Sequence, residues 1–212
     1  MNITHYGHCC LLIEEQGIQI LIDPGSYSSG YTELENIDCV LITHEHPDHL
    51  HVDSLRTLLV HNPSAKVITN ESVYEVLHTE GIACGVLRDN ESIEVKGVMI
   101  EGLGTQHALI HSSIPQSGNT GFFINHLLWY PGDAFTDPKK KVHILALPVA
   151  GPWMKISEAI DYAIMVAPKV CFPVHDGGLK SPSTPHSIST RVLKEYGIEF
   201  TVLTHGASHS FE

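Results

Sequence analysis

Positive charge is scarce in this sequence, which has 12 Lys and Arg against 24 Asp and Glu and therefore a formal net charge of −12. Tight non-specific binding of nucleic acid depends on a basic surface, so the composition argues against a nucleic-acid partner. It does not exclude a small anionic substrate, because bound metal ions can reverse the local field. Charged residues make up only 17% of the chain and hydrophobic residues 42%, a balance typical of globular proteins.

Long apolar runs and a secretion signal are also missing. No apolar run approaches membrane-spanning length, and Met1–His5 is not a basic segment that precedes an apolar core. We therefore expect a cytoplasmic protein with no membrane partner. The five cysteines are odd in number and include no C-x-x-C pair, which predicts small buried thiols rather than disulfides. A length of 212 residues predicts a single domain over residues 1–212.

The most informative stretch is Thr43–His49, which reads Thr-His-Glu-His-Pro-Asp-His. It follows Val40–Ile42, an apolar run typical of a buried strand, and precedes His51–Val60, where leucines recur at helical spacing. Three histidines and the carboxylate of Asp48 thus lie in a strand-to-helix loop. Neutral imidazole and carboxylate suit zinc and similar divalent ions. More histidines and carboxylates follow later strands, which favours two ions over one.

This H-x-H-x-D-H motif after an apolar strand resembles the hallmark of the metallo-β-lactamase superfamily. The resemblance implies an α+β fold, a four-layer αββα sandwich of two mixed sheets with outer helices. The expected order of elements agrees, because a block of strands with helices is followed by a second such block. Other expectations concern particular elements: an edge strand at Met1–Thr4, a helix N-cap at Asn70, a last helix at Ser187–Tyr196 and a last strand at Glu199–Leu203.

The resemblance also implies a set of metal ligands. His44 and His46 would bind a first ion, and Asp48 and His49 a second. Asp133 would bridge two ions roughly 3.5–4 Å apart. His175 would complete the second ion.

The remaining ligand of the first ion is either His107 or His111, because both follow the strand expected at Val98–Gly102. We favour His107, which lies closer to the strand end, and then expect His111 to line the pocket.

Four further residues are expected to support the site. Asp23 would hold the metal loop by hydrogen bonds. His8 stands in Gly-His-Cys-Cys-Leu-Leu-Ile, which resembles the opening of a branch that includes ascorbate-6-phosphate lactonase, and this places it near the metal pocket. Trp153 and Lys155 follow a strand that should end at the same rim, so both are predicted to line the pocket.

These expectations predict hydrolysis of a small ester, lactone or phosphodiester. Two divalent ions, zinc by preference and manganese as the alternative, would hold a water, lower its pKa toward ~7 and supply a bridging hydroxide. Asp48 would orient this nucleophile and pass a proton to the leaving group, while His8 would steady the oxyanion. A mononuclear iron oxidoreductase of the sulfur dioxygenase type and a non-enzymatic, metal-stabilised binding domain remain alternatives. The sequence specifies neither the substrate nor the oligomeric state.

Overall fold

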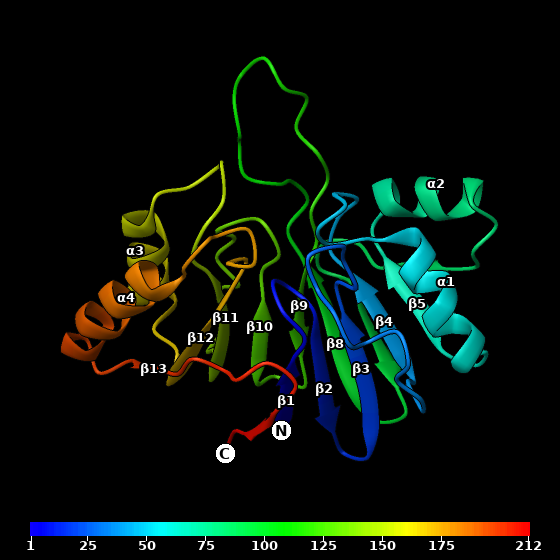
Figure 1. Cartoon of the computed structure of the whole chain (residues 1–212), viewed down its shortest axis with the longest axis horizontal. Coiled ribbons are helices and arrows are strands. Elements are labelled where there is room, and N and C mark those ends of the chain that lie inside the picture. The colour runs from blue at the N-terminus through cyan, green and yellow to red at the C-terminus, as the bar shows by residue number, and fades with distance from the viewer.

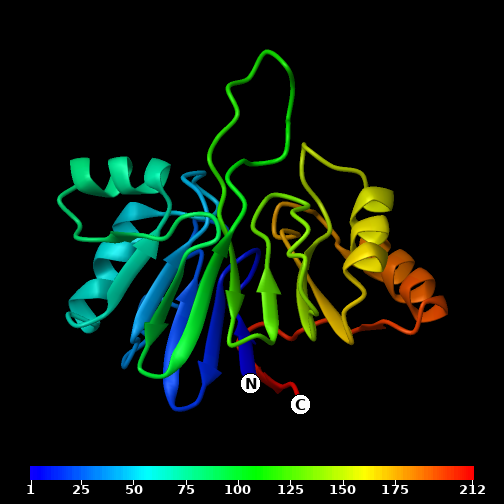
Figure 2. The ribbon, with the colours of Figure 1, turned by 180° about the vertical axis from the view of Figure 1, so that it is seen from behind.

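The computed structural model describes residues 1–212 and contains two seven-stranded sheets that face each other (Figures 1 and 2). The first sheet and its helices comprise β1 (Asn2–His5), β2 (Leu11–Glu15), β3 (Ile18–Ile22), β4 (Cys39–Ile42), α1 (Val52–His61), β5 (Lys66–Thr69), α2 (Glu71–Thr79), β6 (Gly85–Val86) and β14 (Ser208–Ser210). The second sheet and its helices comprise β7 (Ser92–Val95), β8 (Val98–Leu103), β9 (Gly121–Ile124), β10 (Leu128–Tyr130), β11 (Ile144–Pro148), α3 (Ile156–Val166), β12 (Val170–Val174), α4 (Ser183–Glu195) and β13 (Glu199–Phe200).

Both sheets are mixed, with strand orders β14-β1-β2-β3-β4-β5-β6 and β13-β12-β11-β10-β9-β8-β7. Helices α1 and α2 pack on the outer face of the first sheet, and α3 and α4 on the outer face of the second (Figure 1). The predicted αββα sandwich is therefore confirmed. No helix has the length and apolar character needed to cross a membrane.

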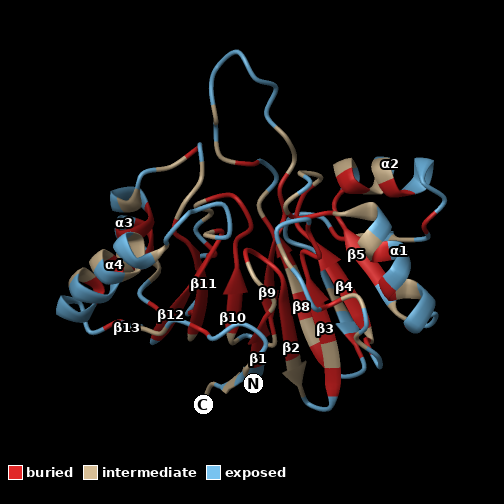
Figure 3. Ribbon diagram, viewed as in Figure 1, coloured by how far each residue is buried: buried red, intermediate tan, exposed pale blue.

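Three apolar layers hold the sandwich together. A cluster of 24 buried residues fills the space between the sheets, and a cluster of 14 lies under each helix pair. The inner parts of the strands are accordingly buried while the outer helix faces are exposed (Figure 3). The neighbouring Cys9 and Cys10 belong to different layers, Cys9 between the sheets and Cys10 beneath α1 and α2. All five cysteines are free and four are buried, as the sequence predicted.

The terminal elements differ in part from expectation. Strand β1 is not an edge strand, because β14 pairs with it from within the polar tail, which carries no hydrophobic strand pattern. Helix α4 begins at Ser183 rather than Ser187, since a proline such as Pro185 is tolerated in a first helical turn. Strand β13 ends at Phe200 rather than Leu203. The N-cap at Asn70 is confirmed, and its side chain accepts a hydrogen bond from the backbone N–H of Val73 at 3.0 Å.

One edge of the sandwich collects several strand ends. Strands β3 and β4 are parallel, as are β10, β11 and β12, so their carboxyl ends meet at this edge. Strand β8 runs the same way because both β8 and β10 are antiparallel to β9. The amino end of β2 also lies here, since β2 is antiparallel to β3. We call this edge the rim; it is uppermost in Figure 1, beneath the long green loop between β8 and β9.

Candidate metal centre

The rim carries the histidines and carboxylates that the sequence predicts to bind metal or to support the site, apart from the alternative His111. Their positions follow from the strands: His8 precedes β2, Asp23 follows β3, His44, His46, Asp48 and His49 follow β4, His107 follows β8, Asp133 follows β10 and His175 follows β12. Both sheets therefore contribute side chains to one centre.

The donor atoms form two adjacent groups. In the first, one donor atom from each of four residues lies within 4.8 Å of the others: His44, His46, His107 and Asp133. The second group meets the same condition: His8, Cys9, His49 and His175. All of these residues are buried except His46, which is half-buried.

The carboxylate of Asp133 lies between the two groups. Its Oδ1 is 3.1 Å from His49 Nε2, and its Oδ2 is 3.3 Å from His107 Nε2 and 2.9 Å from His175 Nε2. Its backbone N–H donates to the side-chain oxygen of Asn119 at 3.0 Å. Asp133, a member of the first group, is thus held so that each of its two oxygens also faces a histidine of the second group.

Hydrogen bonds to the outer ring nitrogens set the orientation of three imidazoles. His49 Nδ1 is 2.7 Å from Asp23 Oδ2, and His107 Nδ1 is 2.6 Å from the carbonyl oxygen of Ala108. Thr43 Oγ1 donates to Asp23, so it accepts from His44 Nδ1 at 3.0 Å. When neutral, each ring therefore carries its hydrogen on Nδ1 and presents the lone pair of Nε2 to the centre, as metal-binding histidines do.

Four buried atoms at the centre make no well-directed hydrogen bond, although the three nitrogens among them lie 2.9–3.9 Å from the Asp133 carboxylate. They are His44 Nε2, His49 Nε2, His175 Nε2 and Asp133 Oδ1. Leaving a buried polar atom unpaired costs about 1–3 kcal/mol, and such atoms are rare in folded proteins. Nitrogen and carboxylate donors that converge without other partners fit divalent cations such as zinc.

Local electrostatics keep much of the centre in forms that can bind cations. Burial, together with the neighbouring His49, lowers the pKa of His44 well below its ordinary value, and burial and His107 lower the pKa of His46. Burial alone would raise the pKa of Asp133, but His49 and the hydrogen bonds to its carboxylate hold that pKa well below its ordinary value. At neutral pH these imidazoles are neutral and this carboxylate is charged.

The surroundings lower the pKa of Asp48 and raise the pKa of His49. Although burial raises the pKa of Asp48, its hydrogen bond with His8 and the nearby histidines lower it to about 2. Burial lowers the pKa of His49, but Cys9, Asp133 and Asp23 outweigh this and raise the pKa well above its ordinary value. A cation that binds Nε2 of His49 would therefore displace a proton.

The structure brings one of the two alternative histidines to the centre. His107 is buried beside Asp133, whereas His111 is exposed and its Nδ1 pairs with Ser113 Oγ at 2.7 Å. The two residues predicted to line the pocket also differ. Trp153 is buried and its Nε1–H donates to Asp133 Oδ2 at 2.9 Å. Lys155 is exposed at the start of α3, so its place in the pocket stays a prediction.

Both ring nitrogens of His8 already have hydrogen-bond partners, one of which is Asp48. Its Nδ1 accepts a hydrogen bond from the backbone N–H of Gly177 at 3.1 Å. The hydrogen of the neutral ring is therefore on Nε2, which donates to Asp48 Oδ2 at 3.1 Å. His8 thus holds the Asp48 carboxylate in place.

Cys9 is the member of the second group that the sequence did not point to. In the sequence, its apolar neighbours made Cys9 resemble the other buried cysteines. Only its position next to His8 could have drawn attention to it. Its side chain is buried, with 1% of its surface exposed.

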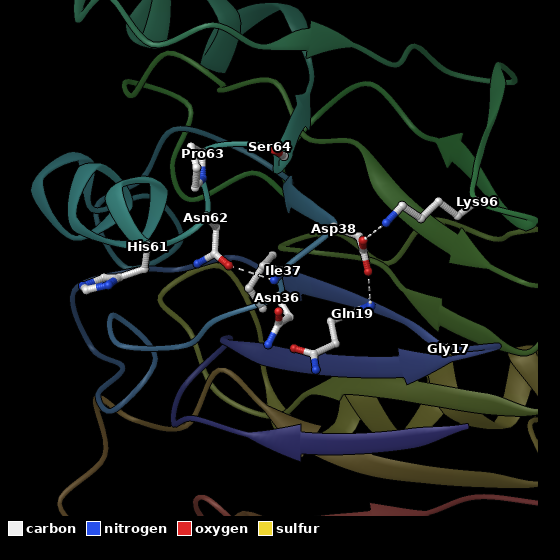
Figure 4. A pocket seen from close by; sticks show the side chains of 10 residues that line it. All are labelled: Gly17, Gln19, Asn36, Ile37, Asp38, His61, Asn62, Pro63, Ser64 and Lys96. Atoms are coloured by element: carbon white, nitrogen blue, oxygen red, sulfur yellow. Dashed lines mark hydrogen bonds and ion pairs between the residues drawn. The ribbon is translucent and has the colours of Figure 1, made fainter.

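A hollow of about 410 Å³ lies at the opposite edge of the first sheet (Figure 4). Two of its polar side chains already have protein partners. Asp38 accepts from Lys96 and from the backbone N–H of Gln19, and Asn62 accepts from the backbone N–H of Ile37. This hollow holds no group of metal donors, so the rim remains the candidate site.

Gly25 allows the loop after β3 to pack against the histidine-rich loop. A Cβ atom at this position would lie 1.8 Å from the backbone oxygen of Asp48. We expect Gly25→Ala to displace Asp48 and His49, to lower the free energy of unfolding by about 1–3 kcal/mol and to weaken metal binding. Denaturant unfolding and metal titration measure both effects. Gly85→Ala, where the nearest atom is 4.0 Å away, is the control, and equal stability of the two variants would contradict the expectation.

Comparison with known proteins supports the family that the histidine-rich motif resembles. A family model described as a β-lactamase superfamily domain matches residues 2–175. The protein Rv0786c of Mycobacterium tuberculosis is 34% identical over 216 residues, with 100% of both chains covered. A UPF0173 metal-dependent hydrolase of Methanocaldococcus jannaschii is 26% identical over 183 residues, covering 82% of this chain and 83% of the relative.

A solved structure agrees with the sequence matches. A protein from Parabacteroides distasonis, provisionally assigned as a metal-dependent hydrolase, superposes with a TM-score of 0.78 at 26% identity, covering 96% of this chain and 92% of the other. The chain therefore belongs to the metallo-β-lactamase superfamily, among relatives that are named metal-dependent hydrolases.

Proposed function

We propose that the chain is a metal-dependent hydrolase that holds two divalent ions on either side of Asp133. His44, His46 and His107 would hold the first ion, and Asp48, His49 and His175 the second. The observation that carries this proposal is the convergence of three buried histidine nitrogens, none with a well-directed hydrogen bond, on the carboxylate of Asp133. Since both sheets contribute donors, we also propose that residues 1–212 act as one domain.

When bound, such ions supply a water that loses its proton near neutral pH, and they polarise the oxygen of the substrate. Asp48 is half-buried and ionised, so its carboxylate can accept a hydrogen bond from the nucleophile and orient it. The contacts of His8 favour a positioning role, because both ring nitrogens are already bonded, one to Gly177 and one to Asp48. Trp153 donates to Asp133 and holds that carboxylate toward both groups.

The space beside the centre favours a small substrate. A cavity of about 320 Å³ lies next to the centre on the side of His8; its walls include Tyr27 and Asp176 and none of the proposed metal ligands. This volume is at the lower end of the range for small-molecule sites, roughly 300–1,000 Å³. An ester, lactone or phosphodiester of modest size would fit the chemistry of the two ions. Zinc suits the donor set best, with manganese as the alternative.

Metal content tests the assignment directly. We expect near two ions per chain in the wild-type protein and about one in His49→Ala, because His49 serves only the second ion. His78→Ala, an exposed histidine on α2, is the matched control and should retain both ions. Mass spectrometry of protein purified without chelator measures the ratio. A single ion in both wild type and His49→Ala would contradict the two-ion assignment and favour a mononuclear centre.

A substrate screen should follow the metal measurement. Esters, lactones and phosphodiesters are offered to the loaded protein, to the chelated protein and to the protein reloaded with zinc or manganese. Activity that disappears on chelation and returns on reloading supports metal-dependent hydrolysis.

A further inference from the structure

The side chain of Cys9 lies at the centre although it belongs to no expected ligand set. Its Sγ, a nitrogen of His49 and a nitrogen of His175 all lie within 4.8 Å of one another. The Nε2 atoms of both histidines are buried and make no well-directed hydrogen bond, and they lie 3.1 and 2.9 Å from the Asp133 carboxylate. Two such nitrogens beside a buried sulfur are a donor set in themselves, because thiolate and imidazole are both protein ligands of zinc.

The other member of this group is committed elsewhere. His8 uses Nδ1 to accept from Gly177 and Nε2 to contact Asp48, so it has no free lone pair for a cation. The backbone oxygen of Cys9 lies 2.8 Å from the hydroxyl of Tyr130, which fixes the main chain and with it the start of the thiol side chain. Cys9 is therefore the group member, besides His49 and His175, that can reach an ion.

We propose that Cys9 provides a thiolate ligand to the ion held by His49 and His175, and that this sulfur makes the second position selective for zinc over manganese. The proposal rests on the proposed function, since it assumes that an ion binds there. A thiol binds a metal as thiolate, so its proton leaves to solvent as the ion enters. Soft sulfur ligands favour zinc, whereas manganese prefers oxygen ligands.

Cys10 supplies an unusually close control. It is the next residue and is equally buried, but its side chain packs in the layer beneath α1 and α2 and not between the sheets. Cys10→Ser thus carries the same chemical change at the same depth, one residue away from the proposed ligand.

Cobalt substitution gives a readout that does not depend on activity. Cobalt(II) bound to thiolate shows an intense charge-transfer band in the near ultraviolet, and bound cobalt of any ligand set shows d–d bands in the visible. We expect both in the wild-type protein. In Cys9→Ser the charge-transfer band should disappear while d–d bands persist, and in Cys10→Ser both should remain. X-ray absorption of the zinc-loaded wild type should show a sulfur neighbour at about 2.3 Å.

Competition between the two metals tests the selectivity. With limiting zinc and manganese offered together, we expect the zinc preference of the second position to fall by at least about tenfold in Cys9→Ser and to stay unchanged in Cys10→Ser, a size typical of perturbed metal sites. An unchanged preference in Cys9→Ser would overturn the selectivity.

The outcomes separate this proposal from the proposed function. Cobalt d–d bands for two ions, without a sulfur band in the wild type, would overturn the role of Cys9 and leave the two-ion hydrolase intact. Absence of bound cobalt would overturn both. The wild-type spectra decide the question even if Cys9→Ser does not fold.

Discussion

Asp133→Asn should reduce hydrolysis about a thousandfold and lower the metal content of the protein. The carboxylate lies within 3.3 Å of nitrogens from His49, His107 and His175, so it serves both donor groups at once. An amide of the same shape keeps one oxygen but loses the charge that offsets two cations. A thousandfold loss corresponds to about 4 kcal/mol, in line with the several kcal/mol of charge stabilisation that metal centres supply. Metal analysis and steady-state kinetics on the substrate found in the screen measure the two effects.

Asp137→Asn is the control for this substitution. It makes the same change four residues later, at an exposed carboxylate that accepts only from the backbone N–H of Lys139. We expect full metal content and full activity there. An Asp133→Asn protein that keeps both ions and turns over normally would show that Asp133 does not bridge the two positions.

Asp23→Asn should destabilise the whole fold as well as the metal loop. This carboxylate is fully buried and meets the backbone N–H and hydroxyl of Thr43 at 2.8 Å, the hydroxyl of Tyr130 at 2.9 Å and His49 Nδ1 at 2.7 Å. An amide nitrogen in place of Oδ2 would face three donors. Because removing one partner of a buried charge pair costs about 3–5 kcal/mol, we expect a loss of at least ~3 kcal/mol. For a chain of this size, this corresponds to a Tm lower by roughly 6–12 °C.

Two comparisons make the result specific. Tyr130→Phe removes one of the four contacts and keeps the charge, so its effect on the Tm should be smaller than that of Asp23→Asn. Asp161→Asn changes an exposed carboxylate on α3 and should leave the Tm unchanged. Calorimetry of the metal-free proteins gives the comparison. A Tm equal to that of Asp161→Asn would show that the buried carboxylate contributes nothing to stability.

The sequence revealed most about segments in which local pattern and tertiary role coincide. The apolar run before His44 is a central strand, and Asn70 begins a helix because its side chain can satisfy an otherwise free backbone N–H. The termini followed no such pattern. Strand β14 is polar and only partly buried, so it depends on pairing with β1 rather than on its own hydrophobicity. Pairing between distant segments is invisible to local periodicity.

In the candidate site, too, the sequence predicted what local pattern determines and not what depends on distant segments. The spacing of His44, His46, Asp48 and His49 identified the loop, because one short segment carries all four. The choice between His107 and His111 depends on how the loop after β8 turns back to the rim, which the sequence does not specify. Trp153 and Lys155 were predicted together, but the chain after β11 directs Trp153 inward and leaves Lys155 exposed, a difference that local pattern does not show. The role proposed for Cys9 depends on His49 and His175, which follow two other strands, so in the sequence only its position next to His8 pointed to it.

The contribution of both sheets to one centre has a consequence for the unfolded chain. His49 and His175, both proposed to hold the second ion, are separated by more than a hundred residues, so this ion would join the two halves of the sequence. Such a link restricts the unfolded ensemble in the way a disulfide does, and the entropy it removes grows with the length of the closed loop. The chain has five free thiols and no disulfide, so the bound ion would be a long-range cross-link that can be added and removed. The supply of metal would then determine how long the protein stays folded as well as whether it is active.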